Sequence, residues 1–156
     1  MANGYDHRQG SPLGVLFLLL GGGLIAAALR PAPDPEWLPI ILFIAAGIFV
    51  ISALCFWFLR IRIDREELRI AFGPLPIFRK THPLAEIAGV EAGRTTLLEG
   101  WGIHYVPGRG WTWNLWGFDC VVLTFTSPEG RPKTLRLGTN EPEKLCRAIE
   151  TAIAKN

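Results

Sequence analysis

Two long stretches without charged side chains dominate the first third of the chain. The first runs from Leu13 to Leu29 and the second from Leu38 to Leu59. At 1.5 Å per residue, helices of these lengths span about 25 and 33 Å, which matches the hydrocarbon core of a bilayer. The pattern therefore predicts a transmembrane helical hairpin over residues 13–59, preceded by a polar tail at residues 1–12.

Small residues recur at regular intervals in both stretches. Gly14, Gly21 and Ala28 are seven residues apart, and so are Ala46 and Ala53, which places each set on one helix face. Small side chains let two membrane helices approach closely, although they are also common in membrane helices in general. We interpret the two sets as the packing seam of the hairpin.

The first stretch also has features of a cleaved signal peptide. Arg8 precedes it, and three alanines stand near its end at residues 26–28. The apolar run is long for a signal peptide, however, and a second run follows after eight residues. We therefore favour a retained span over a cleaved one.

Aromatic and basic residues at the ends of the second stretch indicate the orientation. Trp37 and Trp57 bracket it, as in the aromatic belt of membrane proteins, and Arg60 and Arg62 follow directly. These four residues are the candidates for the membrane interface. Because arginines are rarer before and between the stretches, the positive-inside rule predicts a multi-pass protein of the bacterial inner (plasma) membrane with both termini in the cytoplasm.

The remaining residues, 60–156, alternate apolar and polar side chains with the period of β-strands. Residues 59–64 and 68–72 read as a hairpin, because a charged turn separates them. Further strands are predicted at residues 77–81, 84–91, 101–105, 111–114, 120–126 and 133–137. After these, Leu145, Ile149 and Ile153 recur every four residues, which predicts an amphipathic helix with Asn140 as its N-cap.

About seven short strands followed by one helix is the element order of a pleckstrin-homology-like (PH-like) barrel. Four runs resemble the bacterial membrane-anchored PH-like domains: Leu68–Gly73, Pro83–Val90, Gly100–Ile103 and Gly138–Leu145. The resemblance covers residues 38–154. It implies a mostly-β barrel or sandwich with a C-terminal amphipathic helix, and a domain without established enzymatic chemistry. Members of that family often have arginine where this chain has His104, which puts an anion contact at this position in question.

The composition offers little for catalysis. Sixteen basic and fourteen acidic residues give a net charge of +2, and no basic stripe indicates nucleic-acid binding. The three cysteines and three histidines lack metal-ligand spacing, and no nucleotide-binding, hydrolase or metalloprotease motif is present. We therefore predict no catalytic residues, no metal and no cofactor, and three buried, reduced cysteines.

Tryptophan is the unusual feature of the predicted β domain. Four of the six tryptophans lie at positions 101, 111, 113 and 116, and Trp111 and Trp113 share a strand face. They form either part of the barrel core or an exposed rim that binds a peptide or lipid. For the second case, the ligand-binding candidates are Trp101, His104, Arg109, Trp111 and Trp113.

The favoured function is that of a non-enzymatic inner-membrane protein whose cytoplasmic domain binds another membrane protein or a second copy of the chain. The alternative is binding of anionic lipid headgroups at the bilayer surface, with Trp101, Arg109 and Trp111 as contacts. A membrane enzyme is disfavoured, because no cluster of His, Asp or Glu lies at a span boundary.

Overall fold

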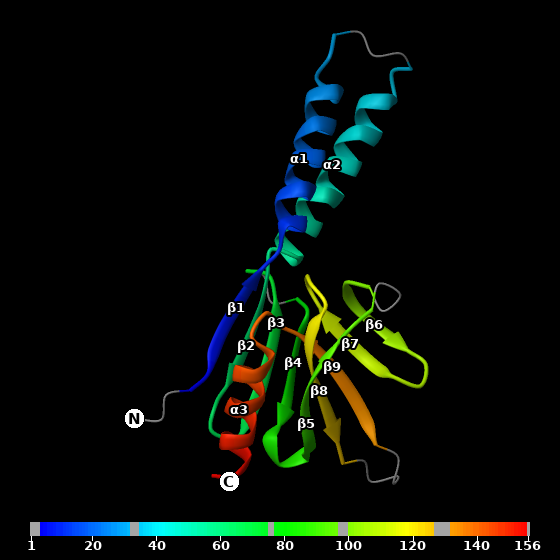
Figure 1. The fold of residues 1–156 in the computed structure, drawn as a ribbon. Coiled ribbons are helices and arrows are strands. Elements are labelled where there is room, and N and C mark those ends of the chain that lie inside the picture. The colour runs from blue at the N-terminus through cyan, green and yellow to red at the C-terminus, as the bar shows by residue number, and fades with distance from the viewer. Residues whose placement is uncertain (1–3, 32–34, 75–76, 97–99, 127–131, 156) are drawn as a thin grey trace.

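Two apolar helices stand on one end of a β domain in this computed structural model, which describes residues 4–31, 35–74, 77–96, 100–126 and 132–155 (Figure 1). The helices are α1 (Pro12–Ala28) and α2 (Leu38–Cys55). Part of the link between them, residues 32–34, lies outside the described residues. By length and composition, α2 is the helix of the described chain able to cross a membrane, and α1 is a shorter apolar helix.

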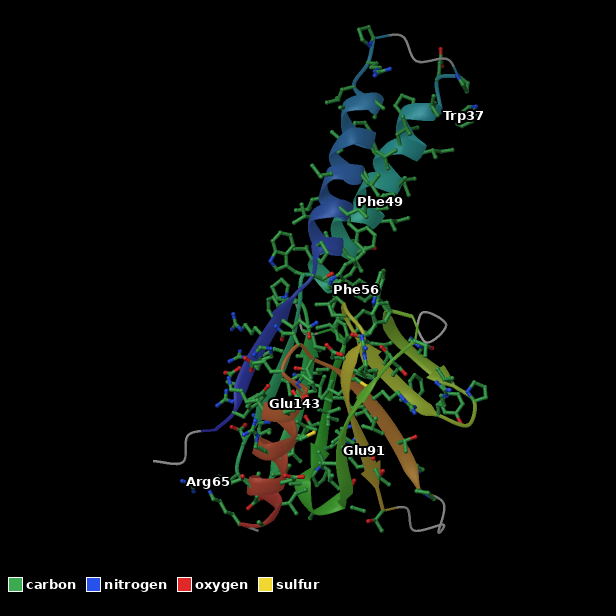
Figure 2. All side chains as sticks on the ribbon, viewed as in Figure 1. Trp37, Phe49, Phe56, Arg65, Glu91 and Glu143 are labelled. Atoms are coloured by element: carbon green, nitrogen blue, oxygen red, sulfur yellow. The ribbon has the colours of Figure 1, made fainter. Side chains whose placement is uncertain are left out.

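The two helices pack along the predicted seam of small residues. Gly14, Gly21 and Ala28 are the buried residues of α1, and Ala46 and Ala53 are buried in α2 together with Cys55. A Cβ atom on Gly21 would lie 3.4 Å from the Ala46 carbonyl oxygen, so glycine brings the two backbones close here. Farther along, the rings of Phe17 and Phe49 are 6.0 Å apart. Figure 2 labels Phe49 on α2. The predicted seam is confirmed.

The second helix is shorter than predicted. It ends at Cys55 rather than Leu59, and strand β2 (Phe58–Ile63) begins three residues later. Leu59 has no exposed surface, and the Phe58 carbonyl accepts a hydrogen bond from the Gly73 amide. The uncharged run therefore continues past the helix because its last residues belong to the β core.

The first sheet contains a strand that the sequence did not predict. Its order is β1-β2-β3-β4, with β1 at Asp6–Gly10, β3 at Glu67–Phe72 and β4 at Arg79–Pro83. Residues 6–10 of the expected polar tail thus pair antiparallel with β2, with Arg8 opposite Arg60. Asp6 forms an ion pair with Arg60, and the Gln9 side-chain amide donates to the Trp116 carbonyl at 2.7 Å. These polar contacts hold β1 in the sheet, although its sequence lacks the alternating apolar residues that normally indicate a strand.

The second sheet has the order β5-β8-β9-β7-β6, and β7 and β9 run parallel. Its strands are β5 (Ile87–Arg94), β6 (Gly102–Val106), β7 (Gly110–Asn114), β8 (Asp119–Phe125) and β9 (Lys133–Gly138). Of the strand predicted at residues 84–91, residues 87–91 lie in β5, whereas Leu84–Glu86 form a 3-10 turn that precedes it. The other predicted strands are confirmed within a few residues.

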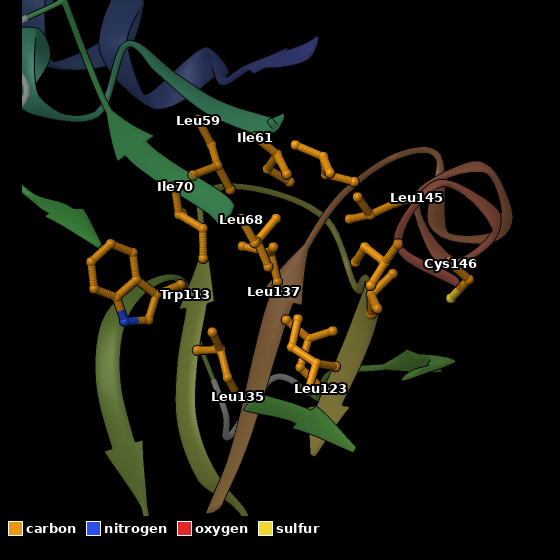
Figure 3. Packing of buried hydrophobic residues seen from close by; sticks show 14 of the residues in the cluster. Leu59, Ile61, Leu68, Ile70, Trp113, Leu123, Leu135, Leu137, Leu145 and Cys146 are labelled. Carbon is orange, nitrogen blue, oxygen red and sulfur yellow. The ribbon is translucent and has the colours of Figure 1, made fainter. Parts of the chain in front are cut away.

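The core fills the space between the sheets and the C-terminal helix α3 (Pro142–Ile153), as Figure 3 shows. Leu145 and Ile149 of α3 are fully buried, as the four-residue spacing predicted. The predicted N-cap is wrong: Glu141 occupies that position, and Asn140 Oδ1 instead lies 2.7 Å from His7 Nε2 of β1. All three cysteines are buried, as predicted.

Candidate functional site

A groove of about 740 Å³ opens between β4 of the first sheet and β9 of the second. Its charged lining residues are Lys80, Lys133 and Glu86, and its aromatic ones are His82, Trp111 and Phe125. The alternation of β4 places Lys80 and His82 on the same side of the strand, facing the groove. The groove therefore combines apolar rings with an excess of one positive charge.

His82 is the most constrained polar side chain in this groove. Its ring stacks on Phe125 with 4.5 Å between the ring centroids, and its Nε2 is buried without a hydrogen-bond partner among the described residues. Burial, helped by the neighbouring Lys80 charge, lowers the pKa of His82 to about 4. His82 is therefore neutral at pH 7 and contributes an uncharged ring to the lining of the groove.

Trp111 of β7, which follows the β6–β7 turn, lines one side of the groove. Trp111 is 44% exposed; Tyr105 packs against it edge-on, and Lys80 Nζ lies 6.0 Å from the centre of a Trp111 ring. The Arg109 carbonyl accepts a hydrogen bond from Thr134 Oγ1 of β9 at 2.8 Å. This contact fixes the turn to β9 and holds Trp111 at the groove.

The predicted ligand-binding residues are not in one place. Trp101 stacks on Trp116 with ring centroids 4.3 Å apart and precedes β6, whereas Trp111 lies opposite Tyr105 at the far end of that strand. Four residues of strand separate Trp101 from Tyr105, about 13 Å. The structure therefore does not bring Trp101, Arg109 and Trp111 together in one headgroup site.

The other two candidates differ from these tryptophans. Trp113 is only 7% exposed and lies in the core against Phe72, because the shared face of β7 is covered by the first sheet at Trp113 and open at Trp111. His104 is half-buried in β6, and its Nε2 has no hydrogen-bond partner among the described residues. Of the five predicted residues, Trp111 therefore lines the groove, and Trp113 belongs to the core.

The four residues predicted to lie at the membrane interface are also found in different places. Trp37 stands at the outer end of α2 in Figure 2, and Trp57 follows the inner end. Arg60 and Arg62 continue along β2, away from the helices, where Arg60 pairs with Asp6 and Arg62 pairs with Asp64 at 3.2 Å. Arg62 lies four strand residues, about 13 Å, beyond Phe58.

Sequence reasoning missed Lys80, His82 and Lys133. The alternation in residues 79–83 could indicate that Lys80 and His82 share a side, but an edge strand of polar residues gives no sign of which side faces another sheet. Within the described residues, no group of three or more His, Cys, Asp and Glu side chains could hold a metal ion. The groove offers lysine charges and aromatic rings that can contact acidic and apolar side chains of a bound segment.

Comparison with known proteins adds no relative: no family model matches the chain, and no curated protein matches it.

Proposed function

We propose that this chain is a non-enzymatic integral protein of the bacterial inner membrane, in which α1 and α2 anchor a PH-like domain that binds other proteins at the cytoplasmic surface. The observation that supports membrane anchoring is the distribution of side chains on the two helices. Their small residues are buried, and large apolar side chains such as Leu19, Ile44 and Ile48 are exposed. Water disfavours such a surface, whereas lipid favours it.

The strand pairing supports a crossing by both helices together. α1 begins after β1 and α2 ends before β2, and these two strands are neighbours in one sheet. The outer ends of the helices are joined by the short link near residues 29–37. If α2 crosses the bilayer, the link lies on the opposite side from the β domain, so α1 must cross as well. At about 25 Å, α1 is long enough for a thin bilayer.

The binding role rests on the groove between β4 and β9. Among the described residues β4 is the last strand of its sheet, so an extended segment beside it can form backbone hydrogen bonds with it. An acidic side chain on that segment would lie near Lys80 and Lys133, and an aromatic or aliphatic one would pack on Trp111. The proposed partner is therefore a protein with an exposed, extended segment of acidic and apolar residues.

Replacing Lys133 with glutamate tests this role. We expect the tagged full chain, purified from gently solubilised membranes of its host, to retain a partner that Lys133→Glu retains at least about tenfold less, because one attractive charge becomes repulsive. Lys155→Glu, the same charge change on an exposed lysine beyond α3, is expected to retain the partner fully. Quantitative mass spectrometry of the three purifications measures the effect. A chain that retains no protein, or equal retention by Lys133→Glu, would contradict the proposal.

A further inference from the structure

We propose that the end of the β domain nearest the helices rests on the membrane surface through an apolar collar of five side chains. The collar consists of Trp57, Ile77, Phe78, Trp101 and Trp116, all of which are substantially exposed. Its occupant is the boundary between the headgroups and the acyl chains of the bilayer that holds α1 and α2. The inference rests on the proposed membrane anchoring and adds a fixed orientation of the β domain relative to the membrane surface.

The first part of the collar is held beside the inner end of α2. The Phe72 amide donates to the Phe78 carbonyl at 2.9 Å, and the Gly73 amide donates to the Phe58 carbonyl at 2.7 Å. A Cβ atom on Gly73 would meet the Leu54 carbonyl oxygen, so Gly73 lies directly against the last turn of α2. Ile77, 64% exposed, therefore projects from the domain at the level where the helices begin.

The second part is held beside the beginning of α1. Gln9, two residues before the N-cap Ser11, donates its side-chain amide to the Trp116 carbonyl, which places the Trp101–Trp116 stack at the same end of the domain. Ile77, Trp101 and Trp116 shortly precede β4, β6 and β8, and in Figure 1 these strands begin at the end of the β domain that faces the helices. Both parts of the collar are thus held near the end of β1 that leads into α1 and the end of β2 that follows α2.

Trp57 joins the collar to the helices. A Cβ atom on Gly14 would lie 2.9 Å from Trp57 Cε3, so the missing side chain lets this indole lie against α1. Trp57 therefore connects the exposed apolar surface of the helices with the exposed apolar surface of the β domain. Continuity with a surface proposed to lie in lipid is the reason to assign a bilayer, rather than a second protein, as the occupant.

The chemistry of the side chains suits this boundary. Tryptophan has an apolar ring and one N–H donor, and such rings concentrate where headgroups meet acyl chains. A cation fits the headgroup side: the Arg8 guanidinium lies 5.1 Å from the ring centre of Phe58, near the same end. Seating the collar would leave Tyr105 and Trp111, at the opposite end of β6 and β7, directed toward the cytoplasm and a partner.

Three labelled cysteines test the collar in the full chain. Ile51→Cys on α2, Ile77→Cys in the collar and Tyr105→Cys at the far end replace side chains that are 60%, 64% and 58% exposed, so the three probes are matched. The native cysteines are buried, and unsubstituted protein gives the labelling background. Each variant is labelled with an environment-sensitive fluorophore and reconstituted in phosphatidylcholine vesicles with or without nitroxide-labelled lipid. A Phe78→Cys variant repeats the collar measurement at a second position.

We expect the lipid nitroxide to quench the labels at positions 51, 77 and 78 at least about twofold more than the label at 105, because they contact lipid. Quenching at 51 without quenching at 77 and 78 would overturn the collar and leave the anchoring intact. Equal quenching at 77, 78 and 105 would also overturn it. No quenching at 51 would refute the anchoring itself and the collar with it.

Discussion

Replacing Gly73 with alanine is expected to lower the free energy of unfolding of the β domain by at least about 3 kcal/mol. Gly73 has φ +69°, a conformation that costs an L-residue energy, and an added Cβ would lie 2.2 Å from the Leu54 carbonyl oxygen and 2.8 Å from that of Cys55. These atoms are helix backbone and cannot turn away. The chain would have to separate α2 from Gly73, so the substitution acts on the junction between the helices and the β domain.

Gly108→Ala is the matched control for this prediction. Gly108 has φ +75°, but nothing lies within 4 Å of an added Cβ. Its substitution should therefore cost only the backbone strain, about 1 kcal/mol. Urea unfolding of both variants in detergent micelles, followed by tryptophan fluorescence, measures the difference. Equal losses for the two variants would mean that the close approach of Gly73 to α2 does not exist in solution.

Replacing Phe72 with alanine should destabilise the domain by about 3–5 kcal/mol, the usual range for a buried phenylalanine. Phe72 is fully buried, and its ring contacts Phe56 edge-on at 5.9 Å and Trp113 at 5.8 Å. It therefore connects the residue after α2 with the second sheet. Its removal leaves a cavity at the point where helix, first sheet and second sheet meet.

Phe78→Ala serves as the control for Phe72→Ala, because Phe78 is the same residue type in the exposed collar. We expect less than half of the loss seen for Phe72→Ala in the same urea titration, since less surface is buried. A loss at Phe78 that equals or exceeds the loss at Phe72 would contradict the assignment of Phe72 to the core.

The sequence predicted those elements whose apolar pattern reflects one buried side. In β2 and β3 every second residue is apolar, and the pairs Leu59–Phe72, Ile61–Ile70 and Ile63–Leu68 face the core in register. The amphipathic helix α3 was predicted for the same reason. The seam of small residues was also correct, because close packing of two helices demands such residues at regular spacing.

The sequence could not predict features that depend on distant contacts. β1 carries almost no apolar side chains, and Asp6 and Gln9 acquire their strand conformation from partners more than fifty residues away. The parallel pairing of β7 with β9 has no local signal. Trp113 is buried because it packs on Phe72 of the first sheet, which is distant in sequence, whereas Trp111 borders the groove. The groove residues Lys80 and His82 lie on a polar edge strand, where alternation does not reveal the buried side.

These contacts give the two ends of the β domain different roles in the proposed account. The end near the helices carries the collar and is held by Gly73 and Gln9. The groove between β4 and β9 is lined by Trp111. Trp111 pairs with Tyr105 at the turn end of β6 and β7. Anchoring by two helices that enter neighbouring strands would fix the direction in which the groove faces.

The most direct test of this account is the sidedness of the link and the C-terminus. Glu36→Cys, in the link, and Lys155→Cys, after α3, are each exposed, while the native cysteines are buried. In intact bacterial spheroplasts treated with a membrane-impermeant maleimide, we predict labelling of Glu36→Cys at once and of Lys155→Cys only after permeabilisation. Labelling of both positions, or of neither, in the intact cells would contradict a chain that crosses the membrane twice.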